Sequence, residues 1–219
     1  MSGIVGSKLN HRGSGLIGSL GTDGQHLLSA GAGKTNVFET VTASSGLTYI
    51  NSVSASDEAA MSFDGDFSAT YENYIIYFSY YHHTNNTDTV MRFRQGDADL
   101  TTSNYITCLG CTEAFDGGSS LQPDNFWNAA YGRIGSGDDC DDADHRNCGQ
   151  MIIYAPLDTS IYHQAHTNCM GFNSIPSYYR YWYSCNMYMA NTTAMSGITF
   201  MADGANITGS ARLYGLQNS

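Results

Sequence analysis

The stretch that decides the fold, Tyr71–Arg94, reads Y-E-N-Y-I-I-Y-F-S-Y-Y-H-H-T-N-N-T-D-T-V-M-R-F-R. Two runs of aromatic and β-branched residues flank the polar tract T-N-N-T-D, a pattern that predicts a long antiparallel hairpin. Successive side chains of a strand point to opposite faces. Tyr74 and Ile76 therefore share one face, while Arg92 and Arg94 alternate with apolar residues in the second arm. This alternation is typical of a sandwich sheet with one solvent face.

Similar runs recur along the chain, separated by glycine and other turn residues. They predict strands at 47–53, 59–63, 100–109, 126–134, 151–156 and 178–189, with a loop at 110–124. A last hairpin is predicted from 195–201 and 206–216 around Asp203-Gly204. The chain has 24 glycines, 16 tyrosines and only 3 prolines, and it shows no amphipathic run with a helical period. We expect an all-β protein, a jelly-roll β-sandwich.

The first part of the chain differs from the rest. Residues 1–45 are rich in glycine and small residues, with isolated Ile, Leu and Val that are too sparse to build a core. We expect an extended glycine-rich attachment arm at 1–45 and the jelly-roll domain at 46–219. A solvated tail is the alternative for the arm, but its leucines and isoleucines favour packing on a neighbouring subunit or on a larger assembly.

The net charge excludes some partners. There are 9 basic and 20 acidic residues, which gives a formal charge of −11. This charge repels phosphate backbones and anionic lipids, so we expect no nucleic acid as a partner. No apolar run approaches the length that spans a bilayer, and the first residues lack the apolar block of a secretory signal. We therefore expect that the protein does not insert into a membrane. We also expect that it is made without export.

One loop gathers carboxylates. They are Asp138, Asp139, Asp141, Asp142 and Asp144. Carboxylates this close repel one another unless they are solvated or share a cation, and hard oxygen ligands suit calcium. The spacing is not that of an EF-hand. Two readings stay open, a calcium site and a solvated surface loop pinned by Cys140 and Cys148.

An even number of cysteines allows a disulfide set whose pairing the sequence does not specify. The candidates are Cys108, Cys111, Cys140, Cys148, Cys169 and Cys185. Cys108 and Cys111 also have the spacing of half a zinc site. The further ligands would come from His163, His166 and Cys169, but the two histidines would point to opposite faces of a strand. Thiols or disulfides are therefore favoured over zinc.

No residue pattern predicts catalysis. There is no G-x-S-x-G elbow, and no spacing places two carboxylates across a cleft. We expect a protein that is not an enzyme. Near the C-terminus, a ring-rich run offers aromatic faces that could stack on sugars: Tyr179, Tyr181, Trp182 and Tyr183. The alternative is that these rings form core and subunit contacts.

Several phrases resemble a group of virion proteins from marine tailed phages. The opening S-G-I-V-G-S-K-L-N-H-R-G-S-G-L-I-G-S-L-G looks like their N-terminal arm, and G-T-D-G-Q-H-L-L-S-A-G-A-G at 21–33 is similar to a phrase of tail fibre and tail appendage proteins. Y-E-N-Y-I-I-Y-F-S at 71–79 and I-T-G-S-A-R-L-Y-G-L at 207–216 resemble the first long strand and the closing strand of the group. The cysteine-rich middle, 108–185, has no counterpart there.

The resemblance implies a non-enzymatic structural protein of the bacteriophage virion. It would be a homotrimer attached to other virion proteins through its arm, with the jelly-roll domain facing outward. We therefore expect a tail fibre or receptor-binding-type appendage, and the ring-rich run makes a host surface glycan its expected partner. Two alternatives stay open: a capsid decoration (cement) protein that stabilises the head, and a carbohydrate-binding or depolymerase module.

Overall fold

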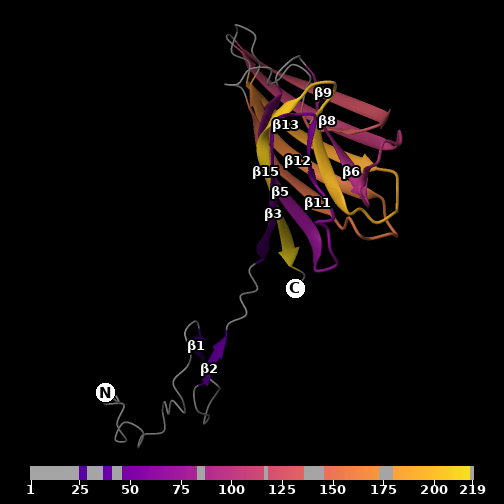
Figure 1. The fold of residues 1–219 in the computed structure, drawn as a ribbon. Coiled ribbons are helices and arrows are strands. Elements are labelled where there is room, and N and C mark those ends of the chain that lie inside the picture. The colour runs from indigo at the N-terminus through magenta and orange to yellow at the C-terminus, as the bar shows by residue number, and fades with distance from the viewer. Residues whose placement is uncertain are drawn as a thin grey trace, which may run out of the picture. The chain divides into compact units, whose positions relative to one another are not determined.

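The computed structural model describes residues 25–28, 37–40, 46–82, 87–115, 118–135, 146–172 and 180–217 (Figure 1). The chain divides into two units, residues 1–44 and 45–219. In the first unit, β1 (Gln25–Leu28) pairs antiparallel with β2 (Val37–Thr40). The second unit holds all the other strands. No helix long and apolar enough to cross a membrane occurs in the part of the chain that the structure describes.

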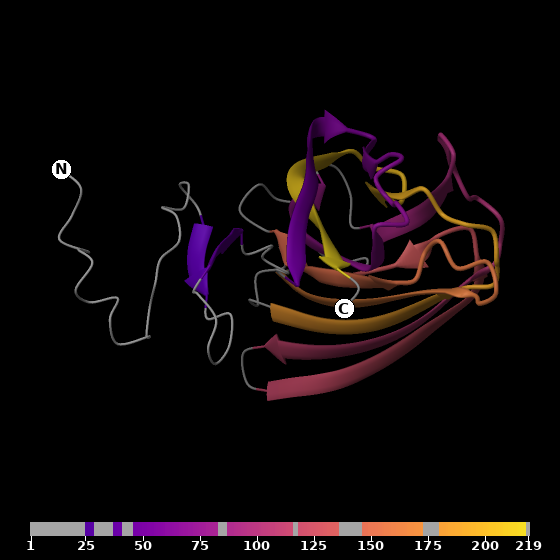
Figure 2. The ribbon, with the colours of Figure 1, turned by 90° about the horizontal axis from the view of Figure 1, so that it is seen from below.

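Eight antiparallel strands form a large sheet. In spatial order they are β3 (Leu47–Glu58), β15 (Ile207–Gln217), β5 (Tyr71–His82), β11 (Asn147–Tyr154), β12 (His163–Phe172), β13 (Arg180–Met189), β8 (Tyr105–Phe115) and β9 (Gly118–Ala129). Aromatic and β-branched residues favour such strands. The turned view shows that the long strands of this sheet curve together (Figure 2).

A small antiparallel sheet forms the second layer. Its order is β10 (Gly132–Arg133), β6 (Thr89–Gln95), β14 (Gly197–Ala202) and β4 (Ala60–Phe63), and β7 (Ala98–Asp99) also pairs with β6. The chain repeatedly changes layer. β3, β5, β11 and β15 lie in the large sheet, and β4, β6, β10 and β14 lie in the small one.

The core lies between the inner faces of the two sheets. Phe78 of β5 meets Phe200 of β14 with ring centroids 5.7 Å apart. Phe93 of β6 stacks with Tyr105 of β8 at 6.5 Å. Both pairs join the large sheet to the small one, and all four rings are buried. Each buried ring of this size contributes roughly 1.5–3 kcal/mol through removal of apolar surface from water. The predicted all-β, sandwich-like architecture is confirmed.

The two predicted hairpins are wrong. β5 and β6, the arms of the first, lie in different sheets: β5 pairs with β11 and β15, whereas β6 pairs with β14 and β10. β14 and β15, the arms of the second, are likewise in different sheets, although an isolated bridge joins Ala202 to Ala205 at the expected turn. A short connection is compatible with both a hairpin and a passage between layers. The local sequence does not distinguish them.

The predicted loop at 110–124 is also wrong. β8 continues to Phe115, and β9 begins at Gly118 and pairs with it over its whole length. The turn signal Asp116-Gly117-Gly118 in this segment suggested a loop. Pro123 is tolerated because β9 is the last strand of the sheet, and an edge strand need not donate every amide to a ladder. β8 is therefore longer than predicted, and β9 adds an edge strand to the large sheet in the segment predicted as a loop.

Candidate functional site

The candidate site is the outer face of the large sheet, the side that points away from the small sheet. On each of the five strands β5, β11, β12, β13 and β8, alternate residues enter the core and the others form this face. The outer face comprises Asn73, Ile75, Tyr77, Ser79, Cys148, Gln150, Ile152, Tyr154, Gln164, His166, Asn168, Met170, Trp182, Ser184, Asn186, Tyr188, Ile106, Cys108, Gly110 and Thr112.

None of these outer-face residues carries a carboxylate, an ammonium or a guanidinium group. This is notable in a chain with 20 acidic and 9 basic residues. The exposed rings and thioether on it include Tyr77 at 44%, Met170 at 55% and Trp182 at 52% exposure. Exposed apolar side chains gathered on one face of a monomer mark an interaction surface. Amides and hydroxyls between the rings make the surface polar without making it charged.

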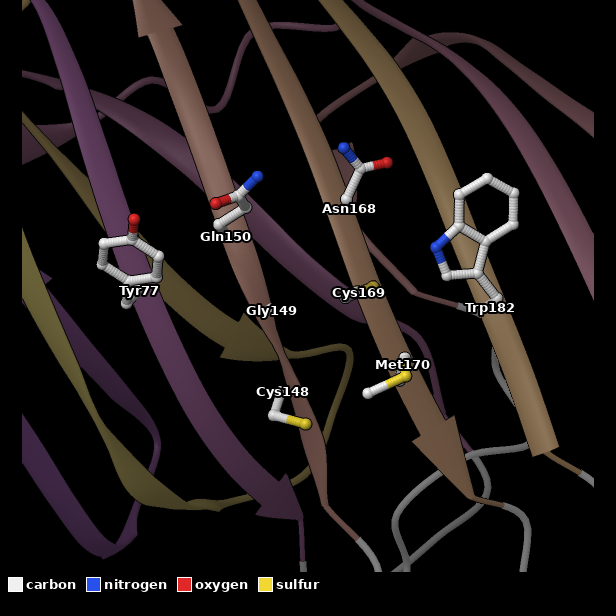
Figure 3. Close-up of a pocket in the computed structure, with 8 residues that line it drawn as sticks. All are labelled: Tyr77, Cys148, Gly149, Gln150, Asn168, Cys169, Met170 and Trp182. Carbon is white, nitrogen blue, oxygen red and sulfur yellow. The ribbon is translucent and has the colours of Figure 1, made fainter.

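An open hollow of about 380 Å³ lies in this face, and its lining includes the side-chain amides of Gln150 and Asn168. Tyr77 on β5 and Trp182 on β13 stand on opposite sides of the Gln150 and Asn168 amides (Figure 3). The ladder register explains the arrangement, because Tyr77 pairs with Gln150 and Gln150 with Asn168 across three strands. Met170 borders the hollow next to Trp182, its own register partner.

The floor of the hollow depends on Gly149. This residue pairs with Cys169 where β11 and β12 approach closely. A Cβ atom added to Gly149 would lie 2.2 Å from the backbone oxygen of Asn168 and 2.7 Å from the Cα of Cys169. Contacts this short with backbone atoms would force the two strands apart. Glycine at position 149 therefore keeps the strands under the site in register.

Tyrosine rings continue from the hollow toward the β3 edge of the sheet. Tyr77 meets Tyr214 with ring centroids 5.8 Å apart at 80°, and Tyr214 meets Tyr49 at 5.7 Å and 71°. These edge-to-face contacts are the favoured geometry for aromatic pairs and are worth about 0.5–1.5 kcal/mol each beyond area burial. Tyr77 is therefore held from the side, so its ring orientation is fixed before a ligand arrives.

Hydrogen bonds hold a polar row beside the hollow. The Asn168 Nδ2 group donates to His166 Nε2 at 2.9 Å, and His166 Nδ1 donates to Asn186 Oδ1 at 2.9 Å. Since an amide nitrogen only donates, Nε2 must accept, which makes His166 the neutral Nδ1–H tautomer. The Asn168 side chain is thereby oriented. Such preorganisation lowers the entropic cost of ligand binding.

The predicted sugar-binding rings have mixed outcomes. Trp182 is exposed and lines the hollow. Tyr183 is wholly buried in the core, so its assignment to glycan contact is wrong: it is the inward neighbour of Trp182 on β13. The backbone of Tyr181 lies in β13, but its side chain and the whole of Tyr179 are outside the described residues. The predicted role of these two residues stays a prediction.

The cysteines divide between the two faces of the large sheet. Cys111, Cys169 and Cys185 are buried, whereas Cys108 is exposed and Cys148 is half-buried on the outer face. None of these five described cysteines is in a disulfide in the structure. A bridge that involves Cys140 stays a prediction, because Cys140 lies outside the described residues.

Strand geometry also bears on the zinc hypothesis. Cys108 and Cys111 are three positions apart on β8, so one thiol faces out and the other faces the core. His163 is buried and His166 faces out, as predicted for two histidines on one strand. Groups on opposite faces of one strand cannot hold the same ion. Among the described residues, no three His, Cys, Asp or Glu side chains come together as a metal site.

The predicted calcium ligands Asp138, Asp139, Asp141, Asp142 and Asp144 lie outside the described residues. Two carboxylates that the structure does describe have structural partners. Asp64 and Asp99 both bind Arg94, at 3.1 Å and 2.6 Å, on the small sheet. Their contacts account for their positions without a catalytic role.

Sequence reasoning missed most of the hollow. The two-residue period of a strand predicts Tyr77 on the face opposite Tyr74, which is correct, but nothing in the local sequence marks Gln150, Asn168 or Met170 as site residues. They come together because β11 and β12 are neighbours in the sheet. The available signal was the alternation of polar and apolar residues along 147–154 and 163–172, where no strand was predicted over these full ranges.

No family model matches this chain, and a search of curated proteins finds no match.

Proposed function

We propose that this chain is a non-enzymatic structural protein of a bacteriophage virion, a tail fibre or receptor-binding-type appendage that attaches to the host through the outer face of its large sheet. The observation that carries the proposal is the uncharged ring-and-amide face around Tyr77 and Trp182. The phage-like phrases in the sequence supply the virion context. The unit of residues 1–44 would attach the protein, as a homotrimer, to other virion proteins.

The strand order supports a jelly-roll assignment for the β-domain. β3-β15-β5-β11 and β4-β14-β6-β10 are two runs of four antiparallel strands, and the chain passes between them. Each strand of the first half pairs with one of the second half, as in a long hairpin wound into two layers. The pairs are β3–β15, β4–β14, β5–β11 and β6–β10.

Four further strands then extend one layer of this jelly roll. β8 and β9 come between β7 and β10 in sequence, and β12 and β13 come between β11 and β14. All four lie at one side of the large sheet, beyond β11. They supply Asn168, Met170 and Trp182, so the binding face depends on additions to the basic fold. Function carried by additions to a common scaffold is the usual arrangement.

Adhesion is the activity that the outer face supports best. A curved, hollowed surface with exposed rings and amides offers contact area and hydrogen bonds, but the described residues around it present no nucleophile with an activating base. The groups on this surface therefore favour the binding of a ligand over its chemical conversion. An extended sheet face is also rigid, which lowers the entropic cost of attachment.

The test has two parts. Gold-labelled antibodies against the chain, applied to intact virions, should decorate tails. The purified full chain, labelled with a fluorophore, should bind host cells and compete with the phage for adsorption. Label on heads and no competition would instead indicate a capsid decoration protein and overturn the adhesion role.

A further inference from the structure

We infer that the ligand of the outer face is an uncharged oligosaccharide that lies across three joined hollows, with several sugar units bound in succession. This inference rests on the proposed adhesive function and specifies its ligand class. It depends on the continuity of the hollows, on their extent and on the kind of groups that line them.

The second and third hollows share lining residues, and a hydrogen bond links the first hollow to the second. The first, bordered by Tyr77 and Trp182, is followed by a hollow of about 470 Å³ that includes Tyr154, His166 and Asn186. The hydrogen bond between Asn168 and His166 connects these two. A third hollow of about 380 Å³ shares Gln164 and Asn186 with the second and continues toward β8. Together they form one track on the outer face.

The track is longer than one sugar ring. Along β11 it extends from Cys148 to Tyr154, about 20 Å at the ordinary rise of a strand. Across the sheet it extends from Tyr77 on β5 to Trp182 on β13, three strand spacings or about 14 Å. A monosaccharide would fill only one hollow. An extended chain would contact rings and amides along the whole path.

The lining groups fit sugars. Trp182, Tyr77 and Tyr154 expose ring surface, and aromatic rings stack on the apolar faces of pyranoses. The amides of Gln150 and Gln164 can each donate and accept, which suits hydroxyl groups that also do both. An apolar partner surface would leave these amides without hydrogen bonds, which is costly on burial. The alternation of rings with amides therefore favours a glycan over an apolar protein surface.

Charge selects the uncharged class of glycan. The residues described as lining the three hollows include no lysine or arginine to pair with uronate or sulfate, and the net charge of −11 repels polyanions at a distance. Arg212 of β15 is the register partner of Tyr77 and stands at the border of the track. One exposed arginine at the border is a weak site in comparison with the clusters that hold anionic polymers. An anionic probe and the Arg212→Ala variant test the contribution of this arginine separately.

Isothermal titration calorimetry of the full chain tests the inference. The probes are neutral gluco-, manno- and galacto-oligosaccharides from mono- to tetrasaccharide, with oligogalacturonate as the anionic probe. We expect binding by at least one neutral series, with affinity that rises more than about tenfold from mono- to tetrasaccharide as successive hollows fill. Equal affinity at all lengths, or no binding by any neutral series at millimolar concentration, would overturn the inference.

Variants locate the ligand. Trp182→Ala should weaken tetrasaccharide binding about tenfold, the loss expected for one stacking contact. Trp127→Ala is the matched control, since Trp127 is 68% exposed on β9 but lines none of the three hollows. Gln164→Ala should weaken the tetrasaccharide more than the disaccharide, which can occupy the ring-bordered hollow alone. An equal loss in Trp127→Ala would place the ligand elsewhere.

Three further results separate this inference from the proposed function. If oligogalacturonate binds more tightly and Arg212→Ala abolishes that binding, the ligand is anionic and the uncharged class is wrong. If cell binding survives periodate treatment of the cells but is lost after protease treatment, adhesion stands and the glycan ligand is wrong. If Trp182→Ala dissociates an oligomer and leaves sugar binding unchanged, the outer face is a subunit interface.

Discussion

Replacing Tyr105 with phenylalanine should weaken the contact between the two sheets. The Tyr105 hydroxyl accepts a hydrogen bond from the backbone N–H of Phe93 at 2.9 Å and donates one to the Leu100 carbonyl at 3.1 Å. β10 pairs with β6 only at Val90 and Met91, so no strand reaches the Phe93 amide on that side. The side chain from the large sheet therefore supplies a partner that the small sheet lacks.

The magnitude follows from the burial of the donor. Phe93 and Tyr105 are both wholly buried, and burial raises the pKa of the Tyr105 hydroxyl, so the group stays protonated as the pH rises. A buried N–H without a partner costs about 1–3 kcal/mol. The ring itself is retained in Tyr105→Phe, so no cavity forms beyond the oxygen. We expect a loss of about 2 kcal/mol, or roughly 4–8 °C in Tm for a domain of this size.

Urea unfolding of the full chain, followed by tryptophan fluorescence and repeated by calorimetry, measures the change. Tyr77→Phe is the matched control, because it removes the same hydroxyl from a ring that is 44% exposed. We expect that control to change stability by less than about 0.5 kcal/mol. A Tyr105→Phe loss no greater than that of the control would refute the argument that this hydroxyl satisfies the Phe93 amide.

Three further predictions concern single side chains. Burial lowers the pKa of His163 from its ordinary 6.5, so as the pH falls the unfolded chain binds a proton at this residue before the folded chain does. The free energy of unfolding should therefore decrease as the pH drops below about 6.5. The urea midpoint of His163→Gln should decrease less over the same pH range than that of the unchanged protein. Gly149→Ala should lower the free energy of unfolding, measured in urea, by about 1–3 kcal/mol because the new Cβ atom would clash with backbone atoms. Gly110→Ala is the control and should change stability little, because its nearest contact would be at 3.7 Å. Equal losses in the two variants would contradict this argument. Burial raises the pKa of Cys185 to about 12, so mass spectrometry after brief iodoacetamide treatment should find exposed Cys108 labelled and Cys185 unlabelled until the chain unfolds.

The alternation of side chains was sufficient to predict the fold class. Tyr74, Ile76 and Phe78 enter the core and Tyr77 faces out, as a two-residue period requires. The proline at 156 follows the end of β11 at Tyr154, as expected for a residue that cannot donate to a ladder. These features depend on local geometry alone. They could therefore be predicted without knowledge of which strands are neighbours.

Strand pairing could not be predicted in the same way. The segments on both sides of T-N-N-T-D have hairpin composition, yet β5 and β6 lie in opposite sheets. Whether two strands joined by a short connection pair with each other depends on which distant strands compete for their edges. Here β11 and β15 occupy both edges of β5. The sequence of the connecting residues therefore does not indicate which strands pair.

The sequence by itself determined the strand-rich character, the inward and outward side chains of the strands it located, and the acidic net charge, because each depends on residue type and on a period of two. The tertiary structure alone decided that Tyr77, Gln150, Asn168 and Trp182 share one hollow. These residues come from four strands spread over more than a hundred positions, and only the ladder register brings them together. Register is set by the packing of the whole sandwich, so no local pattern could place them.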